Sequence, residues 1–216
     1  TNAADPKQNK QAIDGVFTRL LPDYLMILGS IDVVPHQDIR NTMPSDGDPI
    51  AWGDIPYACE AKYSQQPQDF TGPTRVVGRL PDLTGGGTPG YLIGLLDTAA
   101  QYKSLKPADY QSYLGISALV WRKSTEMSLT NLFGSSTDLQ LSPDRGPKWD
   151  APFISRRAHF INCHGADGDF RFYGQRGQSF PEAHDASFFA GKIKEGTVVA
   201  AECCYGGQLY NPNLTD

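Results

Sequence analysis

The chain has 216 residues, which corresponds to about one domain, or to two small subdomains, when a domain holds roughly 100–200 residues. Its 19 lysine and arginine residues against 24 aspartate and glutamate residues give a net charge of −5. This balance disfavours a nucleic-acid or anionic-membrane partner, because there is no cationic surplus to neutralise phosphates. No apolar run approaches the roughly 18 residues of a membrane span, and no secretory leader opens the sequence.

The four cysteines are too few for a disulfide scaffold in a chain of this size. Cys203 and Cys204 are adjacent, a spacing at which an ordinary disulfide is strained, so all four are expected to be free thiols. Free thiols favour a reducing cytoplasm over secretion. Because the sequence begins at Thr1 rather than at methionine, we expect a processed product or one piece of a longer protein.

The first part of the chain predicts a helix, a buried strand and a long loop. Asp5-Pro6 supplies an N-cap and a first-turn proline, and apolar residues then recur at helical spacing until Pro22. Residues 24–29 form a continuous apolar run closed by glycine, which predicts a strand covered on both faces. Residues 36–72 show little periodicity and predict a long excursion over the surface.

The remainder of the chain repeats a strand–helix rhythm. The expected elements are strand 74–81 with a helix opened by Thr88-Pro89, strand 116–121 with helix 125–133, and strand 158–163 with helix 185–195 and strand 197–203. Residues 143–152 are expected to be a connector. Strands that alternate with helices predict an α/β fold with a mostly parallel sheet and right-handed crossovers.

Two strand ends carry reactive side chains. His164-Gly165 follows the apolar strand 158–163, and Cys204 directly follows strand 197–203, which ends at Cys203, with Gly206 soon after. If these two strands are parallel neighbours, both ends lie at the same edge of the sheet, where α/β proteins place their chemistry. A cysteine and a histidine would then share a cleft, and the imidazole could take the proton of the thiol to form the nucleophilic thiolate.

The period of two along a strand separates the two thiols. Glu202 and Cys204 would face one side, and Cys203 the other. Cys203 continues the apolar alternation and is expected in the core, whereas Cys204 precedes the turn at Tyr205-Gly206 and is expected to be exposed. Cys204 is therefore the predicted nucleophile.

Less specific interpretations stay open for these residues. A histidine at a strand end is often structural, and a single buried cysteine is usually inert. A metal site made from the four residues Cys163, His164, Cys203 and Cys204 is disfavoured, because alternating side chains do not converge and no C-x-x-C spacing is present. Asp167-Gly168-Asp169 could help to hold calcium, but the rest of a calcium-loop signature is absent, so a polar turn is expected. No cofactor is predicted.

The sequence resembles the caspase-like cysteine peptidases, a group that includes caspases, metacaspases, legumains and gingipains. The resemblance is carried by His164-Gly165 after one apolar strand, and by Cys204 after the next, with Glu202 two positions before it. In the first half, residues 22–29 and 76–81 resemble the gingipain-type catalytic domain. The resemblance implies a three-layer α/β/α sandwich in two subdomains, residues 1–110 and a catalytic part, residues 111–216.

The resemblance also implies a role for each residue of the site. Cys204 would be the nucleophile and His164 the general acid/base, and the N–H groups of Gly165 and Cys204 would form the oxyanion hole. Glu202 would line the pocket for the residue before the scissile bond, which suits lysine or arginine, although legumain-like enzymes with an acid there accept asparagine. Glu126 is the candidate for a carboxylate that orients the histidine.

The expected activity is that of a cysteine endopeptidase acting on a protein or peptide. The paired Cys203-Cys204 resembles the metacaspase block, in which the second position attacks. The chain ends at Asp216, soon after Cys204, whereas the family needs further strands to finish its sheet. Two explanations stay open: processing after Asp216, with the remaining strands in a C-terminal small subunit or in more of the same polypeptide, or an arbitrary end or a disordered tail at this position. The alternative is a peptidase-like binding or scaffold module that keeps the fold without turnover.

Overall fold

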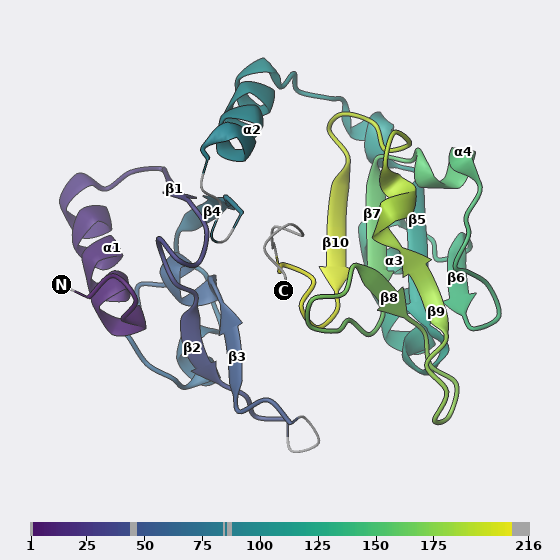
Figure 1. The fold of residues 1–216 in the computed structure, drawn as a ribbon, viewed down its shortest axis with the longest axis horizontal. Helices are drawn as coiled ribbons and strands as arrows, with labels where there is room; N and C mark the ends of the chain where they lie inside the picture. Colours follow the sequence, from purple (N-terminus) through teal and green to yellow (C-terminus); the bar gives the residue numbers. More distant parts are fainter. Residues whose placement is uncertain (1, 44–46, 84, 86–87, 209–216) are drawn as a thin grey trace. The chain divides into compact units, whose positions relative to one another are not determined.

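The computed structural model describes residues 2–43, 47–83, 85 and 88–208. These residues form two compact units that divide between Gln101 and Tyr102, ahead of the expected boundary at residue 110 (Figure 1). None of the described helices combines the length and the apolar character that crossing a bilayer requires.

In the first unit, two α-helices are joined by short strands and 3-10 helices. The described elements are α1 (Pro6–Leu20), β1 (Tyr24–Leu28), β2 (Gln37–Arg40), β3 (Ile50–Gly53), η1 (Ile55–Ala58), η2 (Pro67–Phe70), β4 (Val76–Leu80) and α2 (Gly90–Gln101). Strands β1 and β4 are parallel, and β2 and β3 form an antiparallel pair.

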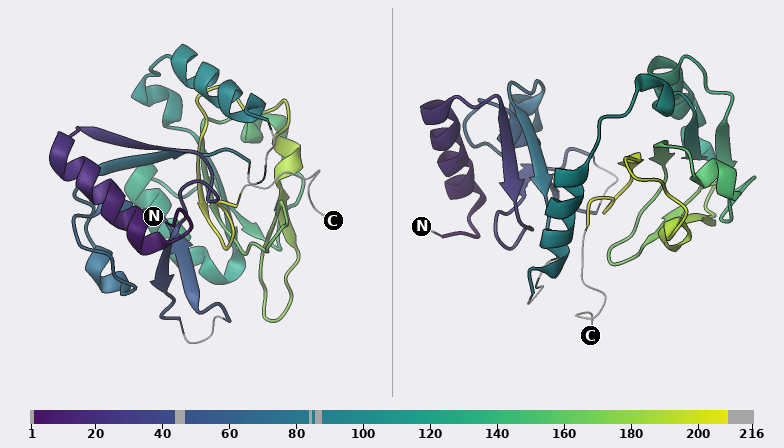
Figure 2. Two further views of the ribbon diagram at one scale, coloured as in Figure 1. Left: turned by 60° about the vertical axis from the view of Figure 1, so that its left-hand side comes forward. Right: turned by 90° about the horizontal axis from the view of Figure 1, so that it is seen from above.

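Helix α1 begins and ends where its sequence predicts. The Asp5 carboxylate accepts a hydrogen bond from the Gln8 N–H at 3.2 Å, Pro6 occupies the first turn, and Leu21 closes the helix in the left-handed conformation. The helix packs against β2 and η1 (Figure 2). Its Lys10 is fully buried, and its ammonium group donates to Asp14 at 2.6 Å and to the Cys59 carbonyl at 3.0 Å.

The expected burial of the first strand on both faces is wrong. Strand β1 pairs with β4, with Tyr24 opposite Val76 and Leu28 opposite Leu80. Ile27 is buried, but Tyr24 and Met26 are 76% and 64% exposed. In the described part of the chain this sheet has two strands, and the face that carries Tyr24 and Met26 is not covered. A continuous apolar run does not indicate which of the two faces is buried.

The expected excursion at 36–72 is also more ordered than its composition predicts. It contains the β2–β3 pair and two 3-10 helices around the buried side chains of Tyr57 and Phe70. The Tyr57 hydroxyl donates to the Pro35 carbonyl and accepts from the Gln37 amide, both at 2.7 Å. Single buried anchors of this kind leave no periodic pattern in the sequence.

The second unit is built around a parallel sheet. Its described elements are η3 (Pro107–Tyr110), β5 (Tyr113–Ala118), η4 (Leu119–Trp121), α3 (Arg122–Phe133), β6 (Leu139–Ser142), α4 (Ala151–Ile154), β7 (Ala158–Asn162), β8 (Arg171–Tyr173), β9 (Glu182–Asp185), η5 (Ala186–Phe189) and β10 (Val198–Glu202). The strand order is β10-β7-β5-β6, and every pair in this sheet is parallel. The predicted α/β class with mostly parallel sheets is therefore confirmed.

The two faces of the four-stranded sheet are covered differently. On one face, Tyr113 and Phe160 pack with Leu129 of α3. On the other, Ile116 and Ile161 belong to a cluster that includes residues of α4 and of the β8–β9 hairpin, which crosses in front of the sheet in Figure 1. Strand β5 is buried along its whole length, whereas β10 lies at an edge and is largely exposed.

Several element predictions in this unit are wrong. The helix expected at 185–195 is reduced to η5, although Asp185 does cap it by accepting from the Ser187 N–H at 2.7 Å. Strand β5 lies earlier than the expected 116–121, because Leu119–Trp121 forms the 3-10 helix η4. Strand β6 and the β8–β9 hairpin were not predicted. Their segments are three or four residues long, too short to show an alternating pattern.

Candidate active site

Strands β7 and β10 bring the predicted histidine and cysteine segments to one edge of the sheet. The two strands are parallel neighbours, with Glu202 opposite Asn162 in the register. The pairing continues past the strand ends, because the Cys163 N–H donates to the Glu202 carbonyl at 3.3 Å. The two segments beginning at His164 and at Cys203 therefore leave the sheet side by side, as the sequence predicted.

Gly165 is the point of closest approach between the two segments. A Cβ atom added to this glycine would lie 1.9 Å from the carbonyl oxygen of Cys204 and 3.5 Å from its nitrogen. Any side chain at residue 165 would displace the cysteine backbone, so glycine is required here for space rather than for an unusual backbone angle. The residue after the histidine thus lies directly against the predicted nucleophile.

The His164 imidazole is held by three side chains. Its Nε2 atom lies 2.8 Å from the Oε1 atom of Gln175. The Trp121 ring packs on it at a centroid distance of 4.3 Å, and the Phe180 ring meets it edge-on at 5.0 Å. The ring is partly buried between these groups. Its backbone is fixed as well, because His164 and Tyr173 exchange two N–H···O hydrogen bonds of 2.9 Å.

The thiols differ in exposure in the direction that the alternation predicts. Cys204 is exposed, as expected, whereas Cys203 is only partly buried and does not belong to the core as expected. The Cys203 sulfur lies 2.6 Å from the position that a Cβ atom on Gly206 would take. Burial raises the pKa of Cys203 to about 11 and that of the fully buried Cys163 to about 12. Both of these thiols are therefore protonated near neutral pH, the unreactive state of the group.

A sharp turn presents Cys204 at the surface. Tyr205 has a φ of 58°, in the left-handed region that non-glycine residues rarely adopt, and the Gly206 N–H donates to the Cys203 carbonyl at 3.3 Å. Beyond the turn, the Gln208 side chain accepts from the Gly168 N–H at 2.8 Å and donates to the Asp167 carboxylate at 2.6 Å. Gln208 thus ties the cysteine segment to the loop that follows His164.

The backbone donors predicted for an oxyanion hole lie on these same two segments. Within the described residues, the N–H groups of Gly165 and Cys204 donate no hydrogen bond to another protein group. They are therefore available to bind an oxygen that carries developing negative charge.

Glu202 and Glu126, the two acidic residues expected at the site, lie in different surroundings. Glu202 is the last residue of β10 and is exposed beside the cysteine segment. Glu126 accepts a hydrogen bond from Arg122 at 2.6 Å, one turn along α3. The expectation that Glu126 orients the histidine is wrong, because it is Gln175 that contacts the imidazole.

The carboxylates of the expected polar turn at 167–169 bind protein groups. The Asp169 carboxylate pairs with Arg171 at 2.9 Å and accepts the Tyr173 hydroxyl at 2.6 Å, and these hydrogen bonds lower the pKa of Asp169 to about 2. Asp167 is engaged by Gln208. In the described part of the chain, no three histidine, cysteine or acidic side chains gather in a way that could hold a metal ion.

Sequence reasoning missed four residues of this site: Trp121, Gln175, Phe180 and Gln208. Trp121 could have been found, because it follows β5, the other neighbour of β7, at the same edge of the sheet. Gln175 and Phe180 belong to the loop that joins β8 to β9, and their segment had no recognisable pattern. Gln208 contacts a loop 40 residues away, which no local signal indicates.

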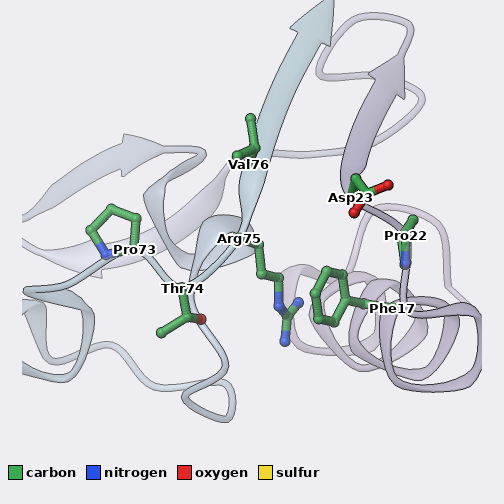
Figure 3. Close-up of a pocket in the computed structure, with 7 residues that line it drawn as sticks. All are labelled: Phe17, Pro22, Asp23, Pro73, Thr74, Arg75 and Val76. Carbon is green, nitrogen blue, oxygen red and sulfur yellow. The ribbon is translucent and has the colours of Figure 1, made fainter.

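A cavity of about 480 Å³ lies in the first unit, between the end of α1 and the start of β4 (Figure 3). Figure 3 shows the Arg75 side chain pointing toward the Phe17 ring, and the guanidinium carbon is 4.3 Å from the ring centroid. Arg75 is also paired with Asp14 at 2.7 Å. None of the predicted site residues lines this cavity.

Comparisons of the chain with protein-family models, with curated proteins and with solved structures gave no match.

Proposed function

We propose that the protein is a cysteine endopeptidase of the caspase-like type, with Cys204 as the nucleophile and His164 as the general acid/base. The observation that carries the proposal is the contact between Gly165 and the Cys204 backbone, because it joins the histidine and cysteine segments at one edge of a parallel sheet. The exposure of Cys204 supports the choice between the adjacent thiols, since its neighbour is held by burial in the protonated form.

The proposed reaction uses the groups of this edge in two steps. His164 takes the proton of Cys204, and the thiolate attacks the scissile carbonyl to give a tetrahedral intermediate. The N–H groups of Gly165 and Cys204 bind its oxyanion, and His164 then gives the proton to the leaving amine. Water hydrolyses the resulting thioester and returns the free thiol.

The proposal extends to the substrate. Glu202 is exposed on the strand that leads to Cys204, so its carboxylate can pair with a lysine or arginine side chain before the scissile bond. An asparagine side chain can also donate a hydrogen bond to it. A protein or peptide with one of these residues at the cleavage position is the proposed substrate class.

The test compares substitutions at the two adjacent thiols. Fluorogenic peptides ending in arginine, lysine or asparagine are incubated with the wild-type protein and with the Cys204→Ala and Cys203→Ala variants. We expect Cys204→Ala to abolish cleavage, and Cys203→Ala to retain it because a thiol with a pKa of about 11 has only about 10⁻⁴ of its population as thiolate at pH 7. The proposal fails if Cys203→Ala is inactive and Cys204→Ala is active.

Complete absence of cleavage by the wild-type protein, together with absence of thiol labelling at Cys204, would also contradict the proposal. It would favour instead a binding module that keeps the arrangement of strands without turnover. Circular dichroism of each variant establishes that the fold is retained.

A further inference from the structure

Gln175 contacts the imidazole of His164 from a segment that neither motif of the site contains. We propose that Gln175 is a positioning residue that keeps the His164 proton on Nε2, so that Nδ1 is the nitrogen that exchanges protons with the thiol. The tautomer follows from the contacts of these two side chains, whereas the part that the tautomer plays in catalysis rests on the proposed function.

The backbone brings Gln175 to the histidine as a diagonal neighbour across an antiparallel pair. His164 and Tyr173 lie opposite each other and exchange two hydrogen bonds of 2.9 Å. Gln175 follows Tyr173 by two positions, so in an extended chain it faces the same side as Tyr173 and His164. This geometry places the amide within reach of the ring, where Oε1 and Nε2 are 2.8 Å apart.

Gly174 fixes the segment that carries Gln175. Its N–H donates to the Pro181 carbonyl at 2.8 Å, and a Cβ atom added to it would lie 2.4 Å from the Ser142 hydroxyl. The backbone beside Gln175 is therefore both hydrogen-bonded and closely packed, which limits the positions that the amide can take.

The orientation of the amide is set by its second hydrogen bond. The Nε2 group of Gln175 donates to the Gly177 carbonyl at 2.9 Å. A carbonyl can only accept, so the NH₂ end of the amide belongs on this side and the Oε1 atom faces His164. Turning the amide over would place two oxygens against each other.

The orientation of the amide determines the tautomer of the imidazole. Because Oε1 is only an acceptor, the Nε2 atom of His164 must carry the hydrogen of this bond. A neutral imidazole has one N–H group, so the lone pair is on Nδ1. The Trp121 and Phe180 rings, at 4.3 Å and 5.0 Å, restrict the ring flip that would exchange the two nitrogens.

The test reads the tautomer directly, by ¹⁵N NMR of the imidazole nitrogens in the full chain. The His164 signals are assigned by their loss in His164→Ala, and the pH is chosen where titration of these signals shows a neutral ring. We expect the wild-type spectrum to show a protonated Nε2 and an unprotonated Nδ1. In Gln175→Leu, which lacks the acceptor, we expect a mixture of the two tautomers.

Two variants separate positioning from a merely structural effect. Gln175→Glu keeps an acceptor oxygen and is expected to restore the Nε2-protonated tautomer, whereas Gln178→Leu, an exposed position of the same loop, is the matched control and is expected to leave the spectrum unchanged. In peptide cleavage we expect Gln175→Leu to lower kcat by about 10-fold to 10²-fold with KM unchanged, because the ring is misplaced rather than the substrate lost.

The outcomes distinguish this inference from the proposed peptidase. A wild-type spectrum with the proton on Nδ1, or a Gln175→Leu spectrum identical to wild type, overturns the role of Gln175 whether or not peptides are cleaved. If instead the tautomer responds as expected but Cys204 is inert, the role of Gln175 in holding the ring is retained and the peptidase assignment fails.

Discussion

Replacing Gly165 by alanine tests the contact that joins the histidine and cysteine segments. The added Cβ atom would lie 1.9 Å from the Cys204 carbonyl oxygen, whereas ordinary van der Waals contacts begin at 3.4 Å. The two segments must therefore separate by about 1.5 Å, the difference between these distances. Overpacking of this kind costs about 1–3 kcal/mol of stability, and a displacement of about 1 Å between reacting groups lowers a rate by about 10²-fold.

The assay combines urea denaturation with the rate of peptide cleavage and of Cys204 alkylation. We expect Gly165→Ala to fold with reduced stability and to lose about 10²-fold in kcat/KM. Gly207→Ala is the matched control, because Gly207 lies only three residues beyond Cys204 and a Cβ atom added to it would meet nothing within 4 Å. If Gly165→Ala and Gly207→Ala behave alike, the close approach of the two segments is refuted.

Two further predictions concern stability. Burial, and to a smaller extent the nearby His159, lowers the pKa of His184 from 6.5 to about 4. The unfolded chain therefore binds this proton more tightly than the folded chain, and the free energy of unfolding should fall by up to about 3 kcal/mol as the pH drops from about 6.5 to about 4. His184→Leu should flatten this part of the curve of unfolding free energy against pH, and an unchanged curve would contradict the assignment. Lys10→Ala should cost about 1–3 kcal/mol, because it leaves the Cys59 carbonyl without its buried donor, while the exposed Lys7→Ala should cost less than about 0.5 kcal/mol. Equal losses in the two lysine variants by urea denaturation would show that the buried ammonium group contributes nothing.

The parts of the fold that were predicted correctly have strong local signals. Helix α1 is marked by the Asp5 cap, by Pro6 and by regular apolar spacing, and these contacts act within one turn of the chain. The strands that precede His164 and Cys204 are apolar runs that end at glycine-containing turns, and their pairing follows from the parallel topology. In these segments the structure that the local sequence favours is the same as the structure that the fold requires, so the sequence alone predicts them.

The parts that were missed depend on contacts between distant residues. Asp185 does cap a helical turn, but η5 ends at Phe189, whose side chain packs against a core cluster that includes Ile161 and Ala183. The contact between Gln175 and His164 can be predicted only when the pairing of His164 with Tyr173 is known. The identity of such a residue gives no hint of its contact, because a glutamine in a polar loop is ordinary.

The exposure of Tyr24 and Met26 has a similar cause. Their apolar run is typical of a strand that is covered on both faces, yet β1 is buried on one face only, the face that carries Ile27. A run of apolar residues in the sequence predicts which side chains favour burial, but it does not identify the helix or strand that would cover them.

The most direct measurement is the pH dependence of alkylation at Cys204, with the modified residue identified by mass spectrometry in the wild-type and His164→Ala proteins. If the imidazole and the thiol form a working pair, the wild-type protein is labelled at Cys204, because His164 accepts the proton of the thiol, and His164→Ala is labelled much more slowly across the pH profile. Identical profiles in the two proteins, or labelling at Cys203 in place of Cys204, would show that His164 and Cys204 do not act together.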